Sequence, residues 1–246
     1  MRISFDRAAE FYDKTRGPPE PVMKQLINRL VNELKGYGNI IDAGVGTGRF
    51  AKPLQDSGFD IVGVDIARAM IDKAVEKGVE NLIRGDACFL PFKDNSFSAA
   101  VCVHILHLLS EWKGALHEIC RVTQRIMVSI DYVRRDPVRE AYNRLLKSYG
   151  YESQRLGKGE WELKDLVKPL KSIFIAAYDN RVDERLAHLS KRAYSSQWEI
   201  PEEVNNKVVD ELKRQFGGRV LPQELRLLIW GINDLLAYCS DFTETD

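Results

Sequence analysis

The chain has 246 residues, of which 44% are apolar and 29% charged, and its 36 Lys and Arg balance its 36 Asp and Glu. This length and composition indicate one large folded domain, or one domain with a sizeable insertion. A formal net charge of zero disfavours a large surface for DNA or RNA, because such surfaces depend on excess positive charge. The sequence does not indicate an oligomeric state.

The cysteines and the apolar runs bear on compartment and metal binding. Four cysteines are scattered along the chain, with no Cys-x-x-Cys pair and no metal-ligand spacing, so no metal site is predicted. The N-terminal segment lacks the apolar stretch of a signal peptide, and the longest apolar run, 99–109, is too short to span a bilayer. We therefore expect a cytoplasmic protein without membrane contact.

Up to residue 131, short apolar strands alternate with amphipathic helices. A helix at 20–35 opens the series. The expected strands are 39–43, 60–65, 81–84, 98–103 and 126–131, and the helices between them are 48–57, 68–77 and 114–122. This alternation predicts βαβ crossovers and a mostly parallel sheet. Sheets of this kind bind ligands outside the carboxyl ends of their strands.

After residue 131 this rhythm breaks. Helical patterns are expected at 136–150, 160–170 and 183–215, and strands at 172–178 and 225–232. The sequence therefore predicts a sheet core with helical insertions late in the chain.

The stretch DAGVGTGRF, residues 42–50, lies at the end of the first expected strand. Its glycines, Gly44, Gly46 and Gly48, weaken regular structure, so their clustering indicates a ligand against the backbone. A dinucleotide-binding loop would have its third glycine at the position of Arg49, and a Walker loop would continue with Gly-Lys and Ser or Thr. Neither pattern is present, which favours a flat ligand that is not rich in phosphate.

Three acids lie at the ends of successive expected strands: Asp42, Asp65 and Asp86. A carboxylate at Asp65 accepts hydrogen bonds from ribose hydroxyls and repels a 2′-phosphate. Asp86, or the backbone beside it, can meet an adenine amino group. In register with the glycines, these acids describe an adenosine site without a phosphate cradle, and we predict S-adenosylmethionine as the cofactor.

At these residues the sequence resembles the class I S-adenosylmethionine-dependent methyltransferases, specifically the small-molecule type with methyltransferase type 11 domains. The resemblance covers residues 8–131 and is carried by IIDAGVGTGRF, VGVDIARAMIDKA, GDACFLPFKDNSFSAAVCVHILHLL and ALHEICRV. Ser98 stands where the family usually has Asp. The resemblance implies a Rossmann-like α/β fold, with a mostly parallel seven-stranded sheet, helices on both faces and helical insertions late in the chain.

The resemblance also implies that the two halves of the chain have different roles. Residues 1–131 would form the cofactor-binding core with an N-terminal cover helix. Residues 132–246 would complete the sheet and add helical substrate caps within the same compact domain. In the N-terminal AAEFYDKTRG, Tyr12 would pack over the cofactor and Arg16 would meet its carboxylate. The other residues expected to bind the cofactor are Asp42, Gly44, Gly46, Gly48, Asp65, Ile66, Asp86, Ala87 and His104.

The acceptor side is expected around two histidines and the late helices. Either His104 or His107 could serve as a base, since imidazole titrates near neutral pH, or both could cap the next helix or fill the pocket wall. The segment KRAYSSQWEIPEEV, 191–204, resembles the family's active-site lid. We expect the substrate pocket to include His107, Tyr194 and Trp198, and an aromatic-lined pocket would suit a small neutral or weakly polar acceptor.

The sequence therefore predicts an S-adenosylmethionine-dependent methyltransferase of a small molecule, acting by in-line methyl transfer. Two alternatives remain open: a cofactor-binding protein that acts as a regulatory or partner subunit, and a methyltransferase of an RNA nucleotide. An NAD-dependent or nucleotide-sugar oxidoreductase is disfavoured by Arg49 and by the lack of a Tyr-x-x-x-Lys pair.

Overall fold

The computed structural model describes residue 5 and residues 9–133, 136–153 and 156–240. One seven-stranded sheet runs through the molecule in the order β3-β2-β1-β4-β5-β7-β6. The strands are β1 (Asn39–Ala43), β2 (Asp60–Asp65), β3 (Leu82–Arg84), β4 (Phe97–Cys102), β5 (Thr123–Val133), β6 (Lys171–Arg181) and β7 (Val220–Gly231). The first five strands pair in parallel, and β7 lies antiparallel to both β5 and β6. The predicted Rossmann-like sheet is confirmed.

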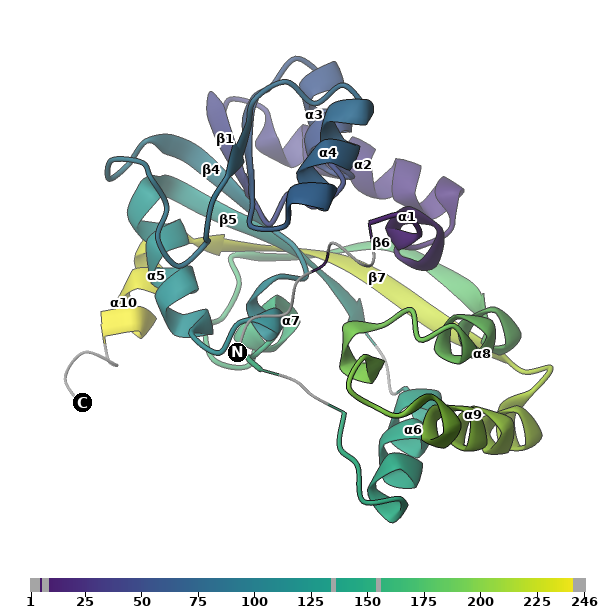
Figure 1. Cartoon of the computed structure of the whole chain (residues 1–246). Coiled ribbons are helices and arrows are strands. Elements are labelled where there is room, and N and C mark those ends of the chain that lie inside the picture. The colour runs from purple at the N-terminus through teal and green to yellow at the C-terminus, as the bar shows by residue number, and fades with distance from the viewer. Residues whose placement is uncertain (1–4, 6–8, 134–135, 154–155, 241–246) are drawn as a thin grey trace.

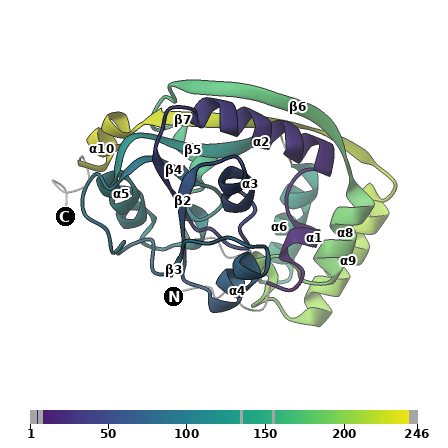
Figure 2. The same ribbon diagram turned by 90° about the horizontal axis from the view of Figure 1, so that it is seen from above.

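The helices cover both faces of this sheet (Figures 1 and 2). They are α1 (Tyr12–Thr15), α2 (Glu20–Leu34), α3 (Ala51–Asp56), α4 (Arg68–Glu76), α5 (Trp112–Val122), α6 (Pro137–Ser148), α7 (Glu160–Leu163), α8 (Val182–Ser190), α9 (Glu202–Phe216) and α10 (Ile232–Ser240). One apolar core joins α2 and α3 to the sheet, and the other joins α5 and α10 to the opposite face. Central strands buried on both faces read as continuous apolar runs, as β1 does.

Strand alternation assigns neighbouring side chains to different cores. Ile40 and Ile41 are both fully buried, but Ile40 packs with Leu26 of α2 whereas Ile41 packs with Leu116 of α5. This alternation fixes the register of β1 against β2 and β4, because a slip by one residue would exchange the two faces. The carboxyl ends of these three strands therefore meet at one edge.

Helices α6, α8 and α9 pack together beside this edge, around a third apolar core (Figure 1). The sequence predicts a helical stretch over 183–215, and the structure divides it into two helices, α8 and α9. Arg192 adopts a left-handed conformation with φ of 50°, and Pro201 precedes α9, so the chain turns between α8 and α9. This turn packs α8 against α9, and together with α6 the two helices form a cap beside the carboxyl ends of the strands.

The C-terminal part differs from the prediction in two further places. Helix α7 has four residues where 160–170 was expected to be helical, and Pro169 restricts the chain shortly after it. Helix α10, absent from the prediction, follows β7 directly and buries Leu235 and Cys239 against α5. A short apolar run after a strand has no period that separates strand continuation from a helix.

Candidate active site

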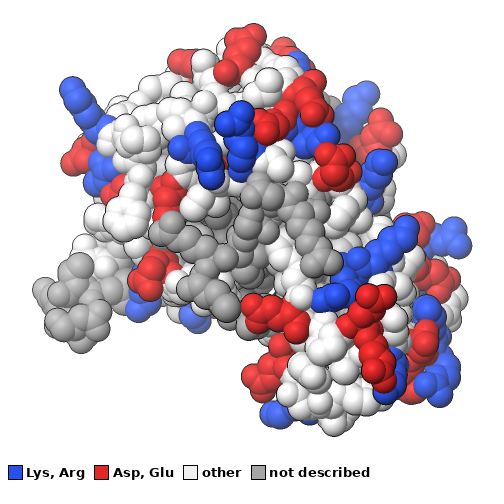
Figure 3. Space-filling model, in the orientation of Figure 1, with Lys and Arg blue, Asp and Glu red and all other residues white. Residues whose placement is uncertain are grey.

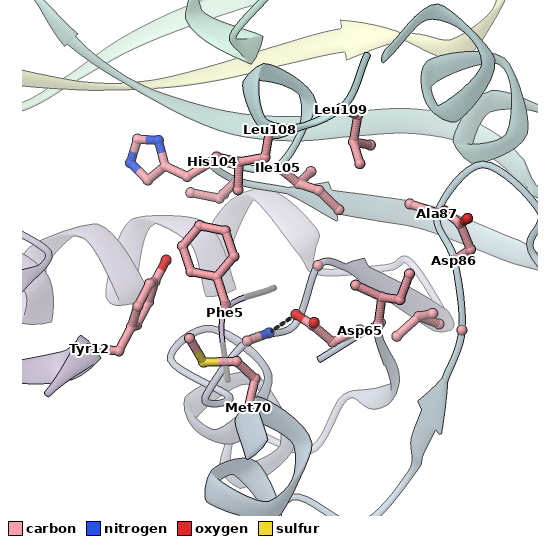
Figure 4. Close-up of a pocket in the computed structure, with 16 residues that line it drawn as sticks. Phe5, Tyr12, Asp65, Met70, Asp86, Ala87, His104, Ile105, Leu108 and Leu109 are labelled. Carbon is pink, nitrogen blue, oxygen red and sulfur yellow. Dashed lines mark hydrogen bonds between the residues drawn. The ribbon is translucent and has the colours of Figure 1, made fainter. Parts of the chain in front are cut away.

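A cavity of about 770 Å³, part of it open to solvent, lies at the carboxyl ends of β1, β2 and β4 (Figure 4). It is lined by Phe5, Tyr12, Gly44, Gly46, Val64, Asp65, Ile66, Met70, Gly85, Asp86, Ala87, Val103, His104, Ile105, Leu108 and Leu109. Eight of the eleven residues expected to bind the cofactor are in this lining; the other three are Asp42, Gly48 and Arg16.

The three glycines of the loop after β1 all have positive φ but serve different purposes. A Cβ on Gly44 would lie 2.8 Å from Ile105 Cδ1, and one on Gly48 would lie 2.7 Å from Val79 Cγ2. A Cβ on Gly46 would meet no atom closer than 3.9 Å. Gly44 and Gly48 therefore permit close packing, whereas Gly46 leaves its side of the cavity open for a ligand.

Asp65, at the end of β2, joins this loop to the next helix. One carboxylate oxygen accepts a hydrogen bond from Gly46 N–H, the dashed line in Figure 4, and the other accepts one from Ala67 N–H, each at 2.9 Å. Asp65 lines the cavity, where its carboxylate is of the kind that accepts hydrogen bonds from ligand hydroxyls. The adjacent Ile66 side chain is partly exposed on the same wall.

Asp86 and Ala87 form another part of the wall, in the loop after β3 (Figure 4). Asp86 Oδ1 accepts a hydrogen bond from Cys88 N–H at 3.0 Å, which holds the turn. Ile105, Leu108 and Leu109 also line the cavity, so its wall combines an acidic group with apolar side chains. This combination suits a flat ring with polar edges.

Asp42 lies behind the glycine loop instead of on the cavity wall. Its side chain is 2% exposed, accepts a hydrogen bond from the backbone N–H of Ala51, and its Oδ2 has no partner among the described residues. Burial, followed by the charge of Asp65, raises the pKa of Asp42 to about 7. Asp42 therefore positions the loop and the start of α3.

We expect Asp42→Asn to flatten the pH dependence of stability. Between about pH 4 and 7 the folded state keeps a proton on Asp42 that the unfolded state releases, so this group lowers the free energy of unfolding as pH rises. The loss amounts to about 1.4 kcal/mol for each unit of pKa difference. Urea unfolding at pH 4 to 8 checks this. Asp60→Asn, at the exposed start of β2, is the control, and parallel curves for wild type and Asp42→Asn would contradict the assignment.

The N-terminal segment covers the cavity, as the resemblance implies. Tyr12 and Phe5 lie on its wall, with their rings 6.3 Å apart and edge to face (Figure 4). Asp13 anchors the segment, because its carboxylate accepts a hydrogen bond from Thr47 Oγ1 at 2.7 Å and pairs with Lys77. The cover is therefore tied directly to the glycine loop.

Arg16 faces a second cavity next to the first. Its guanidinium donates to Ala193 O at 2.9 Å and lies 4.3 Å from the ring centroid of Tyr194. Burial lowers the pKa of Arg16. The contact with a cofactor carboxylate that the resemblance implies stays a prediction.

The second cavity measures about 1150 Å³, including the part open to solvent, and shares Phe5, Tyr12, His104 and Leu108 with the first. Its remaining lining residues are Arg16, His107, Arg139, Tyr142, Asn143, Ser153, Trp161, Arg185, Leu189, Tyr194, Ser195 and Ser196. The shared residues make the two cavities adjoining compartments. Most of the residues that line only the second come from the late helices and the segments between them.

His104 sits between the two compartments and His107 belongs to the second. His104 has φ of 62° and its ring stacks on Tyr132, with centroids 5.7 Å apart. Burial, with smaller effects of Arg49 and Arg16, lowers the pKa of His104 to about 4. The His107 ring lies 5.2 Å from that of Trp161.

The loop that carries both histidines is held by hydrogen bonds to a buried acid, Glu160. Glu160 Oε1 accepts hydrogen bonds from Ile105 N–H at 2.6 Å and Leu106 N–H at 2.9 Å. Glu160 is fully buried, and burial raises its pKa. The carboxyl group stabilises the tight turn after β4 on which His104 depends.

Two predicted pocket residues are separated by the structure. Tyr194 lines the second cavity, whereas Trp198 is absent from its lining. The Trp198 ring lies 5.4 Å from that of Phe5, and its indole N–H donates to Arg192 O at 3.2 Å. Trp198 therefore supports the cover segment from behind.

Sequence reasoning missed several wall residues. Phe5 lies before the matching motif, and Met70 has the spacing of an ordinary core residue of α4. Arg139 and Arg185 belong to helices rich in charge, where single arginines carry no signal. Only the packing of α6 and α8 against α9 brings the two arginines to one cavity.

Metal-binding clusters, membrane-spanning helices and surface charge can also be assessed over the described residues. Residues 5, 9–133, 136–153 and 156–240 contain no cluster of three His, Cys, Asp or Glu side chains suited to a metal ion. Across the same residues, every helix is too short or too polar to cross a membrane. Acidic and basic side chains are interspersed on the face shown in Figure 3.

The strand order, the glycine loop and the cavity at the strand ends define a Rossmann-like α/β protein. Residues 41–125 match the family model described as a methyltransferase domain.

Curated relatives match about half of the chain. A demethylmenaquinone methyltransferase of Renibacterium salmoninarum is 34% identical over 124 residues, 49% of this chain and 52% of that protein. A malonyl-[acyl-carrier protein] O-methyltransferase of Yersinia pestis is 30% identical over 125 residues, 50% of this chain and 46% of that protein. The chain spans about half the length of the curated relatives it matches.

Solved structures share the fold over more of the chain. The "putative methyltransferase from antibiotic biosynthesis pathway" of Anabaena variabilis has a TM-score of 0.59 and 15% identity, covering 84% of this chain and 96% of that one. The magnesium protoporphyrin IX methyltransferase of Synechocystis with bound SAH has a TM-score of 0.54 and 12% identity, covering 93% and 95%. These likenesses establish the fold.

Proposed function

We propose that this chain is an S-adenosylmethionine-dependent methyltransferase acting on a small-molecule acceptor. The observation that carries the proposal is the first cavity, where Gly46 leaves the backbone open and the Asp65 carboxylate lies on the wall beside it. The methyltransferase domain matched by residues 41–125 supports the same function, as do structural neighbours solved with SAM or SAH. We also propose the cytosol as its compartment and residues 132–246 as the part that completes the sheet and adds the acceptor cap.

The lining residues fit the cofactor in named roles. Asp65 would accept hydrogen bonds from the ribose hydroxyls, and Asp86 would accept from the adenine amino group. Ile66, Ala87, Gly44 and Gly46 would contact the adenosine, and Tyr12 would cover it. His104 would lie beside the methionine part and Arg16 would bind its carboxylate, while Asp42 and Gly48 would position the loop.

When bound, the cofactor supplies a methyl group on a positively charged sulfur that leaves as a neutral thioether. The task of the chain is to hold the acceptor in line with that methyl group and to keep water away. The cover segment and the cap of α6, α8 and α9 serve this purpose around adjoining cavities. Positioning alone can supply much of the rate.

If the acceptor arrives protonated, a base must take its proton. With a pKa of about 4, His104 is a weak base at neutral pH, since efficient bases have pKa values near the working pH. His107 also lines the second cavity, and we propose His107, in preference to His104, as the base. His104 would then act mainly through its ring, which separates the two cavities.

Tyr194→Ala and Trp198→Ala are expected to differ. Tyr194 lines the acceptor cavity, so its loss should cut methyl transfer about 10- to 100-fold and change cofactor affinity by less than about threefold. Trp198 supports Phe5 and packs with Ala67 and Met70, so its loss should lower the melting temperature and weaken cofactor binding. Calorimetry, thermal melting and a transfer assay on each variant check this. Identical behaviour of the two variants would refute the separation of roles.

Two measurements test the proposed function. Calorimetric titrations with S-adenosylmethionine and with NAD should show binding of the first alone. A transfer assay with radiolabelled S-adenosylmethionine over metabolite and RNA extracts should label a small molecule. Binding without transfer would favour a regulatory subunit, and labelled RNA would favour a nucleotide acceptor. The relatives' names include acceptors as different as demethylmenaquinone and malonyl-[acyl-carrier protein], so they leave the acceptor open.

A further inference from the structure

The second cavity carries an excess of positive charge. Its described lining residues include three arginines, Arg16, Arg139 and Arg185, and neither Asp nor Glu. In a cavity with partly apolar walls such charges attract a ligand of opposite sign more strongly than they would in water. The aromatic residues of the late helices, taken alone, predict a neutral or weakly polar acceptor, and the three arginines change that expectation.

Two of the three arginines have no acid to balance them. Arg139 lies in the first turn of α6, and its side chain pairs with no carboxylate among the described residues. Arg16 contacts the Tyr194 ring and Ala193 O, and it also has no carboxylate partner among the described residues. Arg16 is half-buried, where a cation without a counter-ion is costly unless a ligand supplies the negative charge. Arg139 is exposed, so its charge is accessible to a ligand in the cavity that it lines.

The third arginine is held in place by an acid outside the cavity. Arg185 makes a two-pronged ion pair with Asp136, with contacts of 2.7 Å and 2.5 Å. Asp136 Oδ1 also accepts the backbone N–H of Arg139 at 3.0 Å, so one carboxylate fixes both the start of α6 and the Arg185 side chain. A guanidinium has five N–H donors, so Arg185 keeps donors for a ligand after pairing.

The remaining walls limit what can be attached to the negative group. Tyr142, Trp161, Leu189 and Leu108 offer apolar and aromatic surface in the same cavity. Short polar side chains, Asn143, Ser153, Ser195 and Ser196, are also present. A ligand that satisfies these walls has an apolar or aromatic body and an anionic end.

We propose that the acceptor carries a carboxylate or phosphate group bound by Arg139 and Arg185, on an apolar or aromatic body that lies against Trp161 and Tyr142. This inference rests on the proposed function, because it names the class of acceptor for the same site. The proposed anion site does not depend on Arg16, which we assign to the carboxylate of the cofactor. Arg139 remains available for the acceptor, because it has no acid partner among the described residues. Both oxyanions match the planar fork of a guanidinium.

A binding measurement tests the anion site without turnover. Purified full-length protein, with and without saturating S-adenosylhomocysteine, is titrated with 2-naphthoate, 2-naphthyl phosphate and the neutral 2-naphthamide. We expect at least one anion to bind about tenfold more tightly than the amide or better. The anion that binds more tightly identifies the group as carboxylate or phosphate. Equal binding of all three, or absence of anion binding, would overturn the proposal.

Matched variants locate the site. Arg139→Gln should remove most of the preference for the anion, whereas Arg144→Gln should leave it unchanged. Arg144 lies on the exposed surface of the same helix and is not among the residues that line the cavity, so it controls for the loss of one charge. An equal loss in both variants would mean that the preference is a general charge effect and would overturn the assignment.

A turnover measurement separates this proposal from the function on which it rests. A metabolite extract is divided on an anion exchanger at pH 8, and each fraction is assayed with radiolabelled S-adenosylmethionine. We expect the acceptor in the retained fraction, with KM raised at least about tenfold by Arg139→Gln and kcat little changed. An acceptor in the unretained fraction would overturn the anionic acceptor and keep the methyltransferase. Failure of every fraction would count against the methyltransferase, and the binding measurement would still decide the anion site.

Discussion

Gly46→Val is expected to abolish binding of S-adenosylmethionine while the domain stays folded. The Cβ position of Gly46 is open, with no atom closer than 3.9 Å, and Gly46 lines the first cavity. The Cβ of a valine would therefore fit beside the loop, and its side chain would extend into the space of the ligand. Calorimetric titration measures the affinity, and circular dichroism during thermal unfolding shows whether the fold persists.

The control for Gly46→Val must reproduce its backbone strain. Gly46 has φ of 54°, a conformation that costs an ordinary side chain about 1–2 kcal/mol. Gly58 has φ of 88° and also has open space at its Cβ position, but it lies after α3, outside the lining of the cavity. Gly58→Val should lose similar stability and bind normally. Wild-type affinity in Gly46→Val would show that the ligand does not lie against this loop.

Asp65→Ala is expected to weaken cofactor binding by about 1.5–3 kcal/mol, the scale of removing a charged hydrogen-bond partner. Two effects add in this variant. The ribose would lose its acceptor, and Gly46 N–H and Ala67 N–H would lose the carboxylate that now orders them. Titration calorimetry on wild type and variant gives the difference.

Asp60 provides the matched control on the same strand. It begins β2 at the amino end, is exposed, and pairs in register with Asn39 at the start of β1. Asp60→Ala removes the same charge from β2, far from the cavity, so it should leave affinity within about twofold of wild type. A similar loss in both variants would place the ligand somewhere other than the carboxyl end of β2.

Much of the cofactor side could be predicted because its signals are local. A parallel strand buried on both faces is a short apolar run, and its carboxyl end is the next polar or glycine residue. Asp65 and Asp86 could therefore be assigned to one edge of the sheet without knowing the strand order. The prediction was less accurate for Asp42, which occupies the right place in the chain but faces inward, since a strand's last residues alternate between the two faces.

The late helices show where such reasoning ends. Their sequences predict helices, but the positions of Arg192 and Pro201 in the turn between α8 and α9 decide how α8 and α9 pair. The same turn places Trp198 against Phe5, from the opposite end of the chain. Contacts between residues so far apart have no pattern in the sequence, because they depend on how whole elements dock.

Local patterns along the chain are enough to predict the sheet, the glycine loop and the acids at its edge, because strand period and glycine conformation act over a few residues. The chemistry of the second cavity depends instead on how the late helices pack. Arg139 and Arg185 belong to different helices, and Asp136 joins them only after α6 and α8 have packed on their apolar faces. Burying those faces supplies the free energy that holds the charges together, and that free energy depends on surfaces that meet only in the folded chain.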